Sequence, residues 1–281
     1  MKLLVPLDGS PVSEGILPHV RPLLRSGAHQ LHLVRVLDQE APGAEEAEAA
    51  ARTYLDRQWR PNPGTPIEVR THVLHGDPAG RIVDLADALG VELIAMSTHG
   101  RSGLSRWTRG SVAERVLHEA RSPLLLANPR GLTGVSPEAR FARVLVPLDG
   151  SRLSASILPH AVRYARASGA DLLLLHVDVP GTSGVHDTPE VAERRAQERA
   201  ERRLQDERLR LLGEGLTPHV VGAYGDPAEQ IMAAVERHDA TLVAMASHGR
   251  TGLARWQFGS VAEKVLRHTA APLLVRCRAA R

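Results

Sequence analysis

The sequence repeats itself at long range. The segment Leu3–Ser10, LLVPLDGS, recurs at Val144–Ser151 as VLVPLDGS. Farther along, His99–Leu117 recurs at His248–Leu266 with fourteen of nineteen positions identical. The copies are offset by 141 positions at the start and by 149 later. A period of that length is far too long for a solenoid repeat, so the pattern indicates a duplicated domain.

The boundary between the copies follows from composition. Residues Asn128–Ala139, NPRGLTGVSPEA, are rich in Pro, Gly, Ser and Thr, which is typical of a linker. A chain of 281 residues is long enough for two ordinary domains. We therefore expect domains over residues 1–127 and 140–281, joined by residues 128–139.

Short apolar runs alternate with helical patterns within the first copy. We expect strands at Leu3–Leu7, Leu31–Leu37, Pro66–Leu74, Val91–Met96 and Pro123–Ala127, and helices at Pro11–Ser26, Ala44–Trp59, Pro78–Leu89 and Ser111–Ala120. This alternation predicts right-handed crossovers and a parallel sheet, hence an α/β fold. Pro18 and Pro159 should kink the first helix of each copy. The second copy should carry one longer helix, Thr188–Leu212.

Composition argues against several classes of partner. The formal net charge is only +3, and the aromatic residues are three Trp, three Tyr and two Phe, with no arginine run interleaved among them. Nucleic-acid binding is therefore not favoured. The single cysteine, Cys277, forms no intrachain disulfide, and no Cys/His cluster has zinc spacing.

The N-terminal sequence and the apolar runs bear on localisation. The chain opens at once with an expected strand and lacks the apolar region of a signal peptide. No run approaches the roughly 20 apolar residues that a membrane span requires. We expect a soluble cytoplasmic protein that binds neither membrane nor nucleic acid.

The expected fold indicates where a ligand would bind. In a doubly wound sheet, ligands lie beyond the carboxyl ends of the strands, where the strand order reverses. Asp8 follows the first strand at that end, and the glycine-rich loop within His99–Leu117 leaves the fourth strand at the same end. If those strands are neighbours, Asp8 and the loop face each other across one crevice. Asp149 takes the same place in the second copy.

The loop has the chemistry of an anion site. Gly100 and Gly110 would let backbone N–H groups approach a phosphate. Ser111 opens the following helix, and the N–H of Val112 is among its unsatisfied donors. Arg101 adds a permanent positive charge. Taken alone, a serine in the position of Ser111 is more often only a helix N-cap.

The other residues near the expected crevice have more than one possible role. Asp8 would repel phosphate, so it should contact ribose or base groups, or act through a metal ion. Taken alone, an aspartate in this position is more often a turn residue. The loop lacks the pattern G-x-x-x-x-G-K-[ST], so a nucleotide site here is not of the Walker type. His99 and His248 are best explained as loop-packing residues. The same applies to Trp107 and Trp256, which should anchor the loop rather than stack on a base.

These motifs resemble those of the universal stress protein family, over nearly the whole chain. Nucleotide-binding members carry G-x-x-G, nine residues, then G-[S/T]. The second, third and fourth signature positions are Gly100, Gly110 and Ser111 in the first copy; in the second copy they are Gly249, Gly259 and Ser260. Both copies depart from the signature at its first glycine, where Ser97 and Ala246 stand.

The resemblance implies a five-stranded parallel sheet of order 3-2-1-4-5 in each copy and ATP in the crevice. It implies that Val36 and Val177 pack on adenine and that Asp8 and Asp149 correspond to the Pro-x-Asp of strand one. It also implies that domains pair, often through the last strand, either within this tandem chain or between two copies of it as a homodimer. The expected nucleotide-binding residues are Asp8, Val36, Met96, Gly100, Arg101, Gly110, Ser111 and Val112, with Asp149, Val177, Met245, Gly249, Arg250, Gly259, Ser260 and Val261 in the second copy. The expected cofactor is ATP, with Mg²⁺ or Mn²⁺.

Three functions are compatible with this sequence. The favoured one is a tandem stress protein that senses or signals by ATP occupancy. A slow ATP hydrolase is the second, with Asp8 or Asp149 and a divalent metal activating water. Because no general base and no paired carboxylates are evident, no catalytic residue is assigned. The third is a scaffold that binds no nucleotide.

Overall fold

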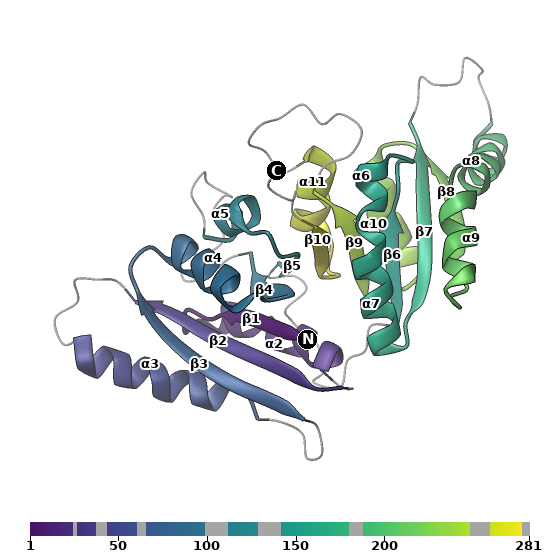
Figure 1. The fold of residues 1–281 in the computed structure, drawn as a ribbon. Coiled ribbons are helices and arrows are strands. Elements are labelled where there is room, and N and C mark those ends of the chain that lie inside the picture. Colours follow the sequence, from purple (N-terminus) through teal and green to yellow (C-terminus); the bar gives the residue numbers. More distant parts are fainter. Residues whose placement is uncertain are drawn as a thin grey trace. The chain divides into compact units, whose positions relative to one another are not determined.

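The computed structural model describes residues 1–24, 27–37, 44–60, 66–98, 112–128, 142–179, 188–247 and 259–276. The chain divides into two compact units, one within Met1–Ala139 and one within Arg140–Arg276. Each unit is a twisted sheet flanked by helices (Figure 1). None of the helices in these ranges is long and apolar enough to span a membrane.

The first unit follows the expected alternation of strands and helices. Its elements are β1 (Lys2–Pro6), α1 (Pro11–Glu14), α2 (Leu17–Val20), the 3-10 turn η1 (Arg21–Leu24), β2 (His29–Leu37), α3 (Ala44–Gln58), β3 (Ile67–His75), α4 (Pro78–Leu89), β4 (Leu93–Ser97), α5 (Val112–Glu119) and β5 (Leu124–Ala127). The strands pair in parallel in the order β3-β2-β1-β4-β5. This confirms the parallel sheet and its order.

The second unit repeats the plan. Its elements are β6 (Arg143–Pro147), α6 (Arg152–Ala155), α7 (Leu158–Ser168), β7 (Asp171–Asp178), α8 (Pro189–Arg203), α9 (Gln205–Gly213), β8 (His219–Tyr224), α10 (Pro227–Arg237), β9 (Leu242–Ala246), α11 (Ser260–His268) and β10 (Leu273–Arg276). The strands pair in parallel in the order β8-β7-β6-β9-β10.

The core of each unit is built from its central strands. Every residue of β4 and β9 is buried, as are the three middle residues of β1 and β6. A parallel sheet covered by helices on both faces requires apolar side chains on both faces of a strand. This explains why these strands read as continuous apolar runs rather than as alternating patterns.

The first helix of each copy breaks, where a kink was expected. In the first copy α1 ends at Glu14 and α2 begins at Leu17. Pro18 lies in the first turn of α2, where its missing N–H costs no hydrogen bond. Pro159 has the same place at the start of α7. The proline therefore starts a new helix instead of bending an existing one.

The prediction of one helix over Thr188–Leu212 was wrong. The chain leaves helical geometry at Leu204, with φ −103° and ψ 12°, between α8 and α9. The side chain of Leu204 is fully buried. The charged residues keep their helical spacing on both sides of Leu204. The spacing of charges therefore gave no sign of the break, which depends on how Leu204 packs.

Candidate functional site

The strand order reverses at the first strand of each unit. Within β1, Leu3 pairs with Leu31 of β2 on one side and with Leu93 of β4 on the other. The crossovers on the two sides of β1 run in opposite directions, and in such sheets a ligand crevice is expected at the carboxyl ends of the two strands, here β1 and β4. The neighbours on which the predicted crevice depends are therefore present.

Asp8 lies in a tightly bonded turn just beyond β1. Its Oδ1 accepts hydrogen bonds from the backbone N–H of Ser10 at 2.9 Å and from the Ser10 hydroxyl at 2.6 Å. The N–H of Asp8 donates to the Ser13 hydroxyl oxygen at 3.3 Å, and that hydroxyl donates to the carbonyl of Ser10 at 2.9 Å. Gly9 between them has a positive φ of 86°, which a side chain would disfavour.

The second copy builds the same turn around Asp149. Ser151 donates its N–H to Asp149 Oδ1 at 2.9 Å, and the Asp149 N–H donates to the Ser154 hydroxyl at 3.3 Å. Gly150 has a φ of 80°. Both carboxylates are thus oriented by hydrogen bonds from their own turn.

The apolar residues predicted to contact a ligand lie at the ends of strands next to the expected crevice. The register pairs Pro6 with Val34, which brings Asp8 beyond β1 alongside the end of β2 that holds Val36. Val36 is half-buried. Met96, the penultimate residue of β4, is buried. In the second copy, Val177 and Met245 occupy the same positions in β7 and β9.

The base of the glycine-rich loop is anchored in the sheet. The N–H of Thr98, directly after β4, donates to the carbonyl of Ala127 at 2.9 Å. In the second copy the N–H of Gly259 donates to the carbonyl of Ser247 at 2.9 Å, so the loop returns to the point where it left. Ser97 and Ala246 are buried strand residues.

The loops themselves fall outside the described residues. This applies to the predicted phosphate contacts Gly100, Arg101, Gly110, Ser111, Gly249 and Arg250, and to His99, Trp107, His248 and Trp256. The ends of the loops are described. Val112 is the first residue of α5, while Gly259 is the N-cap of α11 and Ser260 and Val261 are its first two residues.

Arg35, which the sequence reasoning missed, reaches the crevice of the first copy. Its guanidinium carbon lies 5.1 Å from the centre of the Tyr54 ring, and a Cβ placed on Gly9 would meet it at 3.3 Å. The Tyr54 hydroxyl donates to Glu14 Oε1 at 2.9 Å. Burial, followed by that carboxylate, raises the pKa of the Tyr54 hydroxyl above its usual range.

The second copy has His176 at the position of Arg35, directly before the valine. Its Nδ1 lies 2.8 Å from the carbonyl oxygen of Leu148, so this nitrogen carries the proton and donates. Its Nε2 lies 3.6 Å from Asp178 Oδ1, and Arg199 donates to Asp178 Oδ2 at 3.2 Å. A comparison of the two copies would have revealed a polar residue before the valine in each.

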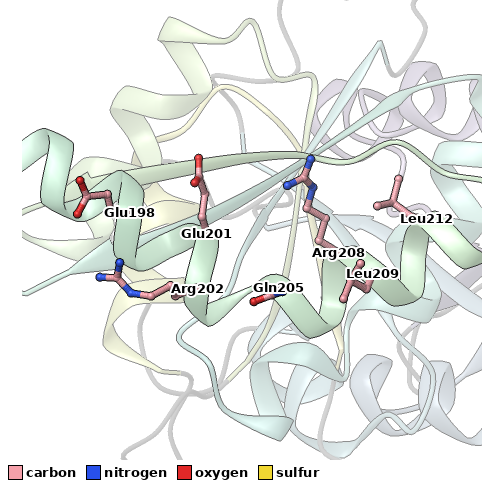
Figure 2. A pocket seen from close by; sticks show the side chains of 7 residues that line it. All are labelled: Glu198, Glu201, Arg202, Gln205, Arg208, Leu209 and Leu212. Carbon is pink, nitrogen blue, oxygen red and sulfur yellow. The ribbon is translucent and has the colours of Figure 1, made fainter.

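Other parts of the described structure offer weaker candidates for a site. A hollow on the outer side of α8 and α9 is lined by exposed charged residues and leucines (Figure 2), and it contains none of the predicted residues. Over the described part of the chain, no group of three or more His, Cys, Asp or Glu side chains could hold a metal ion. The crevice at β1 and β4, with its repeat at β6 and β9, therefore remains the best candidate.

Fold and crevice together define a tandem pair of doubly wound α/β domains. A family model described as the universal stress protein family matches residues 1–128 and again residues 140–276. The chain therefore belongs to the universal stress protein family and carries two of its domains.

Individual relatives agree with this assignment. A universal stress protein of Mycobacterium tuberculosis is 33% identical over 207 residues, which is 70% of this chain and 66% of the relative. One from Methanocaldococcus jannaschii is 30% identical over 142 residues, covering 44% of this chain and 80% of its own. A solved universal stress protein from Archaeoglobus fulgidus shares the fold with a TM-score of 0.69 at 24% identity, over 99% of this chain and 96% of that chain.

Proposed function

We propose that the protein binds ATP in the crevice of one or both domains and acts as a nucleotide-dependent switch in a stress response. The observation that carries this proposal is the adjacency of β1 and β4, which puts the Asp8 turn and the base of the glycine-rich loop at one edge of the sheet. The same adjacency recurs between β6 and β9.

The chemistry of the crevice supports a ligand with two unlike ends. The carboxylate of Asp8 can accept hydrogen bonds from ribose hydroxyls or base amino groups, and Val36 offers an apolar surface beside it. At the other end, α5 begins at Val112, and the N-terminus of a helix favours an anion. A nucleotide has its base and ribose at one end and its phosphates at the other, which matches these two ends of the crevice.

The glycine-rich loop would complete the phosphate end. Gly100, Arg101, Gly110 and Ser111 would supply backbone donors and charge in the first copy, as would Gly249, Arg250, Gly259 and Ser260 in the second. Mg²⁺ or Mn²⁺ would enter with the triphosphate, because the described residues offer no cluster of ligands for a metal held by the protein alone.

Co-purification and thermal shift test this proposal. We expect an adenine nucleotide in the supernatant of the denatured protein, and a rise in Tm on adding MgATP. The double variant Gly110→Val/Gly259→Val should lose both, because the added side chains crowd the two phosphate loops. Gly213→Val is the matched control, since no atom lies within 4 Å of a Cβ at that glycine. Absence of nucleotide together with absence of any shift in the unmodified protein would refute ATP binding.

A further inference from the structure

The sequence Gly-Asp-Pro-Ala occurs once in each copy, at Gly76–Ala79 and Gly225–Ala228, and in each its aspartate starts a helix. Asp77 is the N-cap of α4, and its Oδ2 accepts a hydrogen bond from the N–H of Gly80 at 2.9 Å. Asp226 caps α10 in the same way, accepting from the N–H of Glu229 at 3.0 Å. An N-cap requires only one side-chain oxygen. Each of these carboxylates also binds a second partner.

In the first copy the second partner is the guanidinium of Arg115. Its two terminal nitrogens donate to the two oxygens of Asp77, at 2.6 Å and 2.8 Å. Such a two-pronged pair fixes orientation as well as distance. Arg115 is the fourth residue of α5, the helix that follows the glycine-rich loop. The pair therefore ties the first turn of α5 to the start of α4.

In the second copy a lysine has the same function. Lys264 of α11 donates to Asp226 at 3.1 Å and to Glu229 at 3.0 Å. Each cation lies 38 positions after its aspartate. An ammonium has no planar fork, so a second carboxylate takes the place of the second prong. Glu229 occupies the position of Gly80 in the first copy, so the change from Arg115 to Lys264 is accompanied by a change from Gly80 to Glu229.

The placement of these contacts gives them a consequence for the loop. Before the loop, Thr98 is bonded to Ala127 at the edge of the sheet, and after the loop the first residue of α5 is Val112. One end is thus fixed by the sheet, and the other depends on where α5 begins. The first turn of α5 lies between that end and the bond from Arg115 to Asp77.

We propose that Asp77 with Arg115, and Asp226 and Glu229 with Lys264, are clamps that hold the first turn of the helix after each glycine-rich loop. The clamped turn carries the N–H groups at the phosphate end of the crevice, so these are positioning residues. The effect on the ligand rests on the ATP site proposed above. The exposed pairs contribute little to overall stability, which separates a positioning role from a merely structural one.

The first test needs no nucleotide. Asp77→Asn keeps the cap but removes the charge, and Arg115→Gln removes the cation. Amide hydrogen exchange at Val116 and Leu117 reports the first turn of α5. We expect faster exchange there in both variants. The matched control is Arg121→Gln, which removes an exposed pair with Asp87 at the far end of α4, 3.7 Å apart. Unchanged exchange in both clamp variants overturns the clamp.

The second test measures affinity with the second site crowded by Gly259→Val. We expect Asp77→Asn and Arg115→Gln to weaken ATP binding by about two- to tenfold, the range of a helix-terminus effect, and to leave adenosine binding unchanged. The variant Gly80→Glu/Arg115→Lys copies the arrangement of the second domain. It should bind ATP about as tightly as the parent protein, unlike Arg115→Gln. Equal losses for ATP and adenosine overturn the positioning role. If the parent protein binds no ATP but the exchange differences appear, the proposed function fails and the clamp stands.

Discussion

The Ser13 hydroxyl accepts a hydrogen bond from the backbone N–H of Asp8 at 3.3 Å, and Ser154 makes the same bond with Asp149. Both serines are buried. The two hydroxyls therefore hold the same turn after the first strand of each unit. The residues around the turns differ, since Arg35 approaches one and His176 the other.

Replacing these serines should disturb the turn. We expect Ser13→Ala to lower the stability of the first unit by about 1 kcal/mol, because the part-buried N–H of Asp8 loses this partner. ATP affinity of that unit should fall as well, since the carboxylate is less firmly oriented. Urea denaturation and calorimetric titration measure the two effects. Ser156→Ala, which removes an exposed hydroxyl, is the control; an equal effect there would contradict the role of Ser13.

A histidine pair between β2 and β3 should make the first unit sensitive to acid. Nδ1 of His32 lies 2.9 Å from Nε2 of His72. Burial, followed by the charge of His72, lowers the pKa of His32 to about 4, with Arg70 and Lys2 acting in the same direction and Glu68 against them. Burial also lowers the pKa of His72.

Between pH 6.5 and about 4 the unfolded chain therefore binds more protons at His32 than the folded one. Stability should fall as pH decreases through this window, with a slope of up to about 1.4 kcal/mol per pH unit from this residue. Urea denaturation across the window measures it. The variant His32→Leu/His72→Val copies the second unit, which has Leu173 and Val221 at these positions, and should flatten the dependence. An unchanged slope would reject the assignment.

At Gly222, β8 lies directly against the backbone of α8. A Cβ on Gly222 would lie 2.3 Å from the backbone of Ala196 and 2.4 Å from the N atom of Gln197. We expect Gly222→Ala to destabilise the second unit by about 1–3 kcal/mol through overpacking. The first unit should be unaffected. Gly213→Ala, with open space around it, is the matched control, and a similar loss in both variants would show that the close approach is not the cause.

Arg199 neutralises a buried carboxylate in the second unit. Its NH1 donates to Asp178 at 3.2 Å, and the Asp178 side chain is only 8% exposed. Arg199→Leu should destabilise this unit by about 3 kcal/mol, because it leaves a charge buried without this partner. The double variant Asp178→Leu/Arg199→Leu should recover much of the loss, and the first unit already has Leu37 in place of Asp178. Urea denaturation compares the two; a larger loss in the double variant would contradict this account.

Much of the fold could be predicted because it depends on local patterns. Asp77 followed by Pro78 predicted the start of α4, and the apolar run before His99 predicted β4. The break at Leu204 could not be predicted, because it depends on burial against the rest of the unit. The same is true of the contact between Arg115 and Asp77, since their 38 positions of separation leave no local signature. Arg35 and His176 were not predicted as site residues, because only the folded structure shows that their side chains lie against the turns of Asp8 and Asp149.

The hydrogen bond from Gly259 to Ser247 also bears on how the site can change. The stretch of residues 248–258 connects Ser247 to Gly259, and these two residues are bonded to each other, so its two attachment points lie close together. Its length can then vary without moving β9 or α11, because closing a longer loop costs little extra entropy. Insertions or deletions between Ser247 and Gly259 should therefore leave the strands and helices on either side in place.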